Sequence, residues 1–196
     1  MPRASFLLPA AAHLRPYSQG HVSSLCGLYS LLNGIQLVLW PHCKLSQVQL
    51  KKLFVSGVEH LDQSKALVTV LQYGMDEDTW LQLSNALVKS ASKLTGLRIS
   101  RGFILRFRPG LGRRAAIVAI KRHLRSNSPI LVTLWGSYDH VTVIVGYGGG
   151  RMVLFDSSGF KWIAETSLGM QHSASTKRHQ ITRSSVVALA LRARVK

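Results

Sequence analysis

Apolar residues follow two different periods along the chain. In the first half they recur every three to four positions, and the clearest case is residues 23–40, where Leu28, Leu31 and Ile35 share one helical face. A serine at position 23 or 24 can cap the start of this helix, and Pro41 follows its end. Similar spacing predicts further helices over residues 45–57, 61–73, 79–95 and 113–126. Ser46 is expected to start the second helix, Asp78 to cap the fourth and Gly96 to end it.

Beyond residue 127 the apolar residues form short β-rich runs separated by glycine-containing and serine-containing turns. These runs predict strands over residues 129–135, 140–147 and 151–156, besides an earlier strand within 97–107. Residues 160–168 fit a short strand or a turn, and residues 184–192 fit a last strand or a helix.

Helices followed by antiparallel strands predict an α+β fold with the helices packed on one side of the sheet. The chain has 196 residues, 46% of them apolar, which is enough to bury a core of its own. We expect a single domain over residues 1–196, with an N-terminal arm (1–20), a mainly helical part (21–126) and a mainly β part (127–196).

Targeting and redox signals are weak in this sequence. It has no apolar run long enough for a transmembrane helix. The N-terminal apolar patch is short and interrupted by Pro9, which favours a folded or loose arm over a signal peptide. Two cysteines, Cys26 and Cys43, are too few for a disulfide scaffold. We therefore expect a cytoplasmic protein, with delivery as a secreted effector as the alternative.

The charge is strongly positive and uneven. The formal net charge is +17, and 19 of the 25 Lys and Arg residues lie at or after Lys89. Such a basic half attracts anionic partners, such as nucleic acid, a membrane surface or an acidic protein, or it is simply a solvated face. The basic residues are scattered, with few aromatic residues between them, which is unlike a dedicated nucleic-acid platform.

The candidate chemistry begins with Cys26, at the start of the predicted helix 23–40. A helix N-terminus offers unpaired N–H groups and partial positive charge, which stabilise the thiolate form of a cysteine. A nucleophilic cysteine also needs a histidine to carry the proton and a third group to orient that histidine.

His140 and Asp156 fit these two roles. His140 opens the strand 140–147, and Asp156 closes the next strand, across a glycine-rich turn. Because strands joined by a tight turn pair in antiparallel fashion, we expect the two residues at the same edge of the sheet. Asp139 is a weaker partner for His140, because adjacent residues of a strand point to opposite faces.

The segments SQGHVSSLCGLYSLLNG, DHVTVIVGYGGG and VLFDSSG resemble those of papain-like cysteine peptidases, most of all the bacterial C39-like peptidases. The resemblance implies a papain-like fold with Cys26 as nucleophile, His140 as general base and acid, and Asp156 as its orienting residue. It also implies Gln19 as an oxyanion-hole donor beside the backbone N–H of Cys26. Gln19 lies one residue further from Cys26 than is usual, and Ser18 and His21 are alternatives for that role.

Each residue also has an ordinary structural interpretation. Cys26 fits a buried core position, His140 a strand edge, and Asp156 the start of a turn. His42 beside Cys43 lacks a matching pair for a metal site. Further expectations are a polar, solvent-facing loop for His172 and His179, core positions for Trp135 and Tyr147, and a groove-lining position for Tyr138.

The combination predicts a thiol hydrolase that cleaves a peptide or isopeptide bond through a thioester, without metal or organic cofactor. Deamidation and acyl transfer use the same triad and remain alternatives. A papain-like module that binds an anionic partner without catalysis, or a toxin acting on RNA, are alternatives of another class. Few acidic residues flank the predicted groove in sequence, which favours an acidic or anionic peptide or protein substrate.

Overall fold

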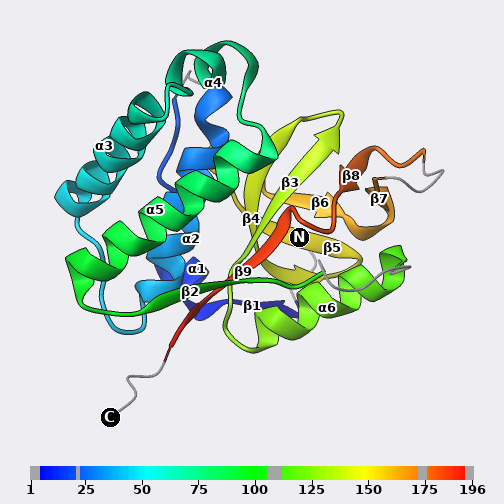
Figure 1. Cartoon of the computed structure of the whole chain (residues 1–196). Helices are drawn as coiled ribbons and strands as arrows, with labels where there is room; N and C mark the ends of the chain where they lie inside the picture. Colours follow the sequence, from blue (N-terminus) through cyan, green and yellow to red (C-terminus); the bar gives the residue numbers. More distant parts are fainter. Residues whose placement is uncertain (1–4, 21–22, 106–111, 172–175, 193–196) are drawn as a thin grey trace.

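The computed structural model of the chain describes residues 5–20, 23–105, 112–171 and 176–192. The fold of these residues is mixed α/β, with the longer helices and the sheet lying side by side (Figure 1). The helices are α1 (Pro9–His13), α2 (Cys26–Leu39), α3 (Gln47–Gln63), α4 (Leu67–Tyr73), α5 (Glu77–Thr95) and α6 (Arg113–Arg125), and single 3-10 turns cover Ser23–Leu25 and Glu165–Ser167.

The sheet has nine strands within the described residues, and its main path runs in the order β2-β9-β3-β4-β5-β6. The pairings along this path are antiparallel, whereas β7 and β8 pair in parallel beside it. The segment that fitted a strand or a helix is therefore a strand, β9. The strands are β1 (Phe6–Leu7), β2 (Ile99–Phe103), β3 (Ile130–Gly136), β4 (His140–Gly148), β5 (Arg151–Phe155), β6 (Trp162–Ala164), β7 (Leu168–Met170), β8 (His179–Ile181) and β9 (Val186–Leu191).

The helix ends match the sequence only in part. Ser46 caps α3 through a capping box with Gln49, and Gly96 ends α5 in the left-handed conformation, both as predicted. Asp78 does not cap α5, because Asp76 accepts from the Thr79 N–H and the helix has already begun at Glu77. The predicted serine cap of α2 is also wrong, since the 3-10 turn precedes the helix and the N-cap position gives no side-chain bond.

α2 is the buried centre of the fold. Thirteen of its 14 residues are buried, which is the expected fate of a helix that is apolar almost all round. It contacts β3, β4 and β9 of the sheet as well as α3 and α5. Glycines permit the close approach, because a Cβ on Gly34 of α2 would meet Leu189 of β9, and one on Gly57 of α3 would meet Leu28.

The N-terminal arm is docked on the sheet. Phe6 and Leu7 pair with Tyr147 and Gly146 of β4, and Leu8 behind them is 1% exposed. A Cβ on Gly146 would meet the backbone of this arm, so the pairing depends on glycine there. In the described part of the chain, no helix has the length and apolar character required to cross a membrane.

The division of the chain at residue 126 is not a division in space. β2 precedes that point, yet it forms the edge of the sheet beside β9. α6 also precedes it and contacts β3, β4 and β7, apart from the cluster of α2 to α5 (Figure 1). The helices are therefore not gathered into one N-terminal layer, and both parts of the sequence contribute to the sheet.

Candidate active site

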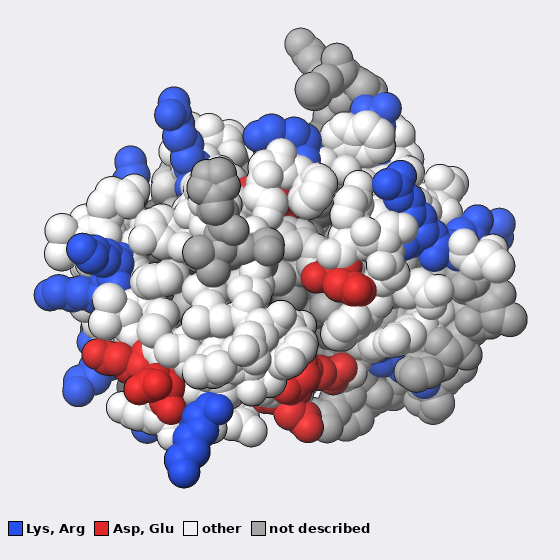
Figure 2. All heavy atoms as spheres, turned by 90° about the horizontal axis from the view of Figure 1, so that it is seen from above, with Lys and Arg blue, Asp and Glu red and all other residues white. Residues whose placement is uncertain are grey.

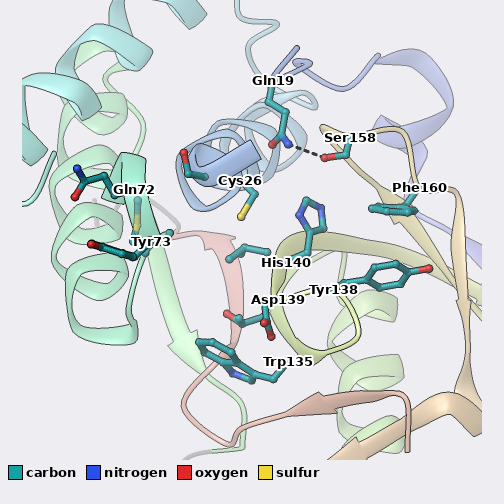
Figure 3. Close-up of a pocket in the computed structure, with 15 residues that line it drawn as sticks. Gln19, Cys26, Gln72, Tyr73, Trp135, Tyr138, Asp139, His140, Ser158 and Phe160 are labelled. Carbon is teal, nitrogen blue, oxygen red and sulfur yellow. Dashed lines mark hydrogen bonds between the residues drawn. The ribbon is translucent and has the colours of Figure 1, made fainter. Parts of the chain in front are cut away.

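Cys26 is the first residue of α2 and lies in the wall of a groove (Figure 3). The 3-10 turn Ser23–Leu25 leads the chain into the helix, so the unpaired N–H groups of the first helical turn lie beside the sulfur. Cys26 is 7% exposed, and a molecule from solvent reaches it through the groove.

His140 and Asp156 face each other across two neighbouring strands. β4 and β5 are antiparallel, with Val143 opposite Phe155, so the start of β4 lies beside the residue that follows β5. The His140 Nε2 and Asp156 Oδ2 atoms are 2.6 Å apart, and both residues are buried. The predicted strand pairing and the proximity of the two side chains are confirmed.

The Asp156 carboxylate has two sets of partners. Its Oδ1 accepts hydrogen bonds from the backbone N–H groups of Ser158, at 2.9 Å, and Phe160, at 3.1 Å. Its Oδ2 faces His140. The turn-forming interpretation and the histidine-orienting interpretation of Asp156 therefore hold together, because the turn fixes the carboxylate that faces the imidazole.

The electrostatics of the pair favour the charged forms. Burial by itself lowers the pKa of His140, but the hydrogen bonds to Asp156 and Cys26 and the charges of both groups outweigh burial and raise it to about 9. Burial by itself raises the pKa of Asp156. The hydrogen bond to His140, the charge of His140 and the hydrogen bond from the Phe160 N–H outweigh burial, so the pKa of Asp156 lies below its usual value. At neutral pH the geometry therefore favours an imidazolium beside a carboxylate.

Gln19 lies above Cys26 and is tied to the same turn as Asp156 (Figure 3). Its Oε1 accepts from the Ser157 hydroxyl at 2.9 Å, and its Nε2 donates to the Ser158 hydroxyl at 2.7 Å. One Nε2 hydrogen is used in this way, which leaves the second for another acceptor. The side chain is 6% exposed and lines the groove together with Cys26.

The backbone before Gln19 is positioned by α2 itself. The Asn33 carboxamide accepts from the Tyr17 N–H at 2.7 Å and donates to the Tyr17 carbonyl at 3.3 Å. Gln36 donates to the Arg15 carbonyl at 3.3 Å. One buried helix therefore supplies Cys26 at its start and, through Asn33, positions the irregular segment that carries Gln19. Ser18, an alternative for the Gln19 role, is exposed and donates to the Ser157 carbonyl, and His21 lies outside the described residues.

The groove has a volume of about 470 Å³ and lies between helix-derived and strand-derived residues. The last residues of α4, Gln72 and Tyr73, form one wall, and Tyr138 and Phe160 lie on the other (Figure 3). The α4 residues and Phe160 were not identified from the sequence, because no motif marks them. Their position depends on how distant segments pack.

Several expectations about neighbouring residues are settled by the geometry. Tyr138 lines the groove and Tyr147 is a core residue, as predicted. Trp135 was expected in the core, but it lines the groove. The His140 Nε2 atom faces Asp156 and not Asp139, whose Oδ1 accepts from the Gly136 N–H at 3.0 Å.

His179 was expected to face solvent, and this is wrong. It opens β8, is 4% exposed and stacks on the Tyr138 ring with centroids 4.7 Å apart. Burial, with a smaller effect of the Arg178 charge, lowers its pKa below the usual value. The loop returns to the sheet because Gly136 of β3 pairs with His179, and nothing in the polar sequence before it indicates this pairing. His172 lies outside the described residues.

The groove differs in charge from the rest of the molecule. Among the described residues that line it there is no Lys or Arg, whereas Asp139 is present. On the face that Figure 2 shows, Lys and Arg side chains lie mostly toward the rim, and acidic side chains reach into the middle. The sequence-based preference for an anionic substrate therefore does not match this lining. Within the described residues, no cluster of three His, Cys, Asp or Glu side chains suited to a metal ion is found.

Compared with known proteins, the chain matches no protein-family model and no curated protein.

Proposed function

We propose that the protein is a papain-like cysteine hydrolase that cleaves a peptide or isopeptide bond. The observation that carries this proposal is the constellation in one groove: Cys26 at a helix start, and His140 held by Asp156 at 2.6 Å. Cys26 also contributes to the raised pKa of the His140 imidazole, which supports a pairing of the two side chains.

In the first step the proton of Cys26 resides on His140, and the sulfur attacks the carbonyl carbon of the scissile bond. The new oxyanion is placed to accept hydrogen bonds from the Cys26 backbone N–H and the second Nε2 hydrogen of Gln19. The C–N bond then breaks, and the leaving amine takes the proton from His140. The product of this half-reaction is a thioester on Cys26 and a free amine.

In the second step a water molecule attacks the thioester. His140 now accepts the proton of this water, the C–S bond breaks, and the proton passes to the sulfur. A carboxylic acid is released and Cys26 is regenerated. Asp156 orients the imidazole throughout, because its Oδ1 is fixed by two backbone N–H groups while its Oδ2 faces Nε2.

Peptide bonds are favoured over small amides because the groove extends to both sides of Cys26, from Tyr73 to Phe160 (Figure 3). Deamidation and acyl transfer follow the same steps, with ammonia leaving or an amine replacing water. They remain chemical variants of one proposal.

The test is digestion of a proteome-derived peptide library, with new termini identified by mass spectrometry. The wild-type protein is expected to generate cleavage sites that are absent with Cys26→Ala and with His140→Ala. Acid quenching early in the reaction should reveal an acyl adduct on Cys26 by intact mass. The proposal is overturned if the three proteins give the same termini and no adduct forms.

A further inference from the structure

Among the described residues that line the groove, Asp139 is the charged group that the proposed chemistry does not use. The charges on His140 and Asp156 offset each other as a hydrogen-bonded pair. Asp139 lines the same groove, is exposed, and makes no ion pair within the described residues. It is an acidic group in a chain whose net charge is +17.

The turn between β3 and β4 holds this carboxylate in a fixed position. Asp139 has a backbone φ of 42°, a conformation that Asp adopts more readily than most residues, and Gly136 at the start of the turn has a φ of 102°. The Gly136 N–H donates to Oδ1 at 3.0 Å. Oδ2 has no such partner among the described residues, and Figure 3 shows the side chain between His140 and Trp135.

Arg178, a cation directly before β8, lies over an aromatic ring. The guanidinium carbon of Arg178 lies 5.4 Å from the centroid of the Tyr138 ring, on the aromatic face. It does not line the groove and does not pair with Asp139. Within the part of the chain that the structure describes, the carboxylate therefore lines the groove without an ion-pair partner.

The groove also offers aromatic surface for the stem of a basic side chain. Trp135 and Tyr138 line it next to Asp139. A Lys or Arg side chain combines an apolar stem, which packs on aromatic rings, with a cationic end, which a carboxylate binds. An acidic side chain in the same place would be repelled by Asp139, and no Lys or Arg among the described lining residues would offset this repulsion.

The overall charge restricts the number of basic residues in such a substrate. The net charge of +17 repels a polybasic segment. This long-range repulsion is screened beyond about 8 Å at physiological salt, whereas the contact with Asp139 is shorter than that distance. A single basic residue in an otherwise neutral segment gains the contact and avoids most of the repulsion.

We propose that Asp139 is a specificity-determining residue that binds one Lys or Arg side chain of the substrate, within two residues of the bond that Cys26 attacks. The inference rests on the proposed function. It names the substrate class of that groove as a peptide segment with a single basic residue beside the cleaved bond.

The test compares the cleavage sites of three proteins on the peptide library: wild type, Asp139→Asn and Glu59→Gln. Asparagine keeps the Oδ1 acceptor for Gly136 and tolerates the positive φ, so this substitution removes the charge and preserves the turn. Glu59→Gln removes one exposed carboxylate from α3, outside the groove lining, and is the matched control. Synthetic peptides with Lys, Gln or Glu at the enriched position then give kcat/KM ratios.

For wild type and the control we expect Lys or Arg to be enriched near the cleaved bond, with kcat/KM about fivefold higher for Lys than for Gln. With Asp139→Asn the Lys-to-Gln ratio should fall to about one, the value for a groove without this ion pair. Cleavage that depends on Cys26 but shows no basic preference, or a preference that survives in Asp139→Asn, overturns this inference and leaves the proposed function standing. If no Cys26-dependent cleavage occurs, the proposed function fails, and this inference fails with it.

Discussion

The two sides of the site are held by different kinds of interaction. On the helix side, packing sets the place of Cys26: Gly27 lies against Trp80 and Met75, where a Cβ would be 3.0 Å from the Trp80 Cδ1 atom. On the strand side, hydrogen bonds set the place of His140, through Asp156 and the turn that follows it. Gln19 is bonded to that turn, and its backbone is positioned by α2.

This contrast indicates to which kind of substitution each side of the site is sensitive. Added volume should displace Cys26, because packed interiors have little free space. A change of charge or protonation should displace or neutralise His140, because its orientation depends on a buried ion pair. The Cys26 sulfur and the His140 imidazole lie close together only if both side chains keep their positions.

The largest effect is expected on the strand side, from Asp156→Asn. The two backbone N–H groups hold the side-chain oxygen at the Oδ1 position, so the new amide nitrogen faces His140 Nε2. This amide nitrogen donates a hydrogen bond to Nε2, whereas the carboxylate accepted one from it. The His140 ring then carries its proton on Nδ1, which cannot accept the proton of Cys26. The kcat for any peptide that the wild type cleaves should fall by as much as about 10⁴-fold.

Steady-state assays with Asp62→Asn as the control check this prediction, because Asp62 is an exposed residue of α3. An Asp156→Asn enzyme with near wild-type kcat would mean that the carboxylate has only the turn-forming role.

The next effect concerns Gln19, the residue shared by both sides. Gln19→Ala removes the Nε2 donor, and kcat should fall by about 10²- to 10³-fold with little change in KM. Ser157→Ala is the comparison, because it keeps the donor and loses only the hydroxyl that holds Oε1. It should cost less than Gln19→Ala. Equal losses, or a change confined to KM, would argue against an oxyanion role.

The pH dependence of stability should report the ion pair. The pKa of His140 is about 9 in the folded protein and about 6.5 when unfolded. The stabilising contribution is therefore complete below pH 6.5 and is lost as the pH rises through 9. Between these values the free energy of unfolding should drop by at most about 3 kcal/mol more in wild type than in His140→Gln. Denaturation by urea at pH 6 and pH 9.5 measures this, and identical pH dependence of the two proteins would contradict it.

A smaller effect on stability is expected on the helix side, from Gly27→Ala. The added methyl group presses on Trp80 and Met75, while alanine favours the helix, so unfolding should change by only about 1 kcal/mol. Activity should fall by up to about 10²-fold, since a small displacement of Cys26 misaligns the attack. Gly102→Ala is the control, because nothing lies within 4 Å of a Cβ there. Unchanged activity of Gly27→Ala would show that volume does not limit this side.

The parts of the fold that depend on local signals were predictable. Ser46 and Gly96 mark helix ends by their own chemistry, and the short turn between β4 and β5 places His140 near Asp156. Features that depend on distant packing were not. Trp135 is apolar enough for a core position, and His179 lies in a polar stretch of sequence. The end of β3 pairs with β8, and there Trp135 lines the groove while His179 stacks on Tyr138.

Charge was the least informative signal. The total of +17 is a sum over the whole chain, whereas no Lys or Arg is found among the described residues that line the groove. Whether the basic surface binds an anionic partner stays a prediction, and binding that weakens steeply with added salt is its signature.

The most direct test of the central claim is the rate of alkylation of the two cysteines by iodoacetamide between pH 5 and 9, followed by intact mass and peptide mapping. Cys26 is buried and Cys43 is more exposed, so exposure alone makes Cys43 the faster site. If Cys26 is a nucleophile paired with His140, it should react first, already below pH 7, and His140→Ala should slow it. Preferential labelling of Cys43, or labelling of Cys26 that rises only above pH 8 and ignores His140→Ala, would contradict the account.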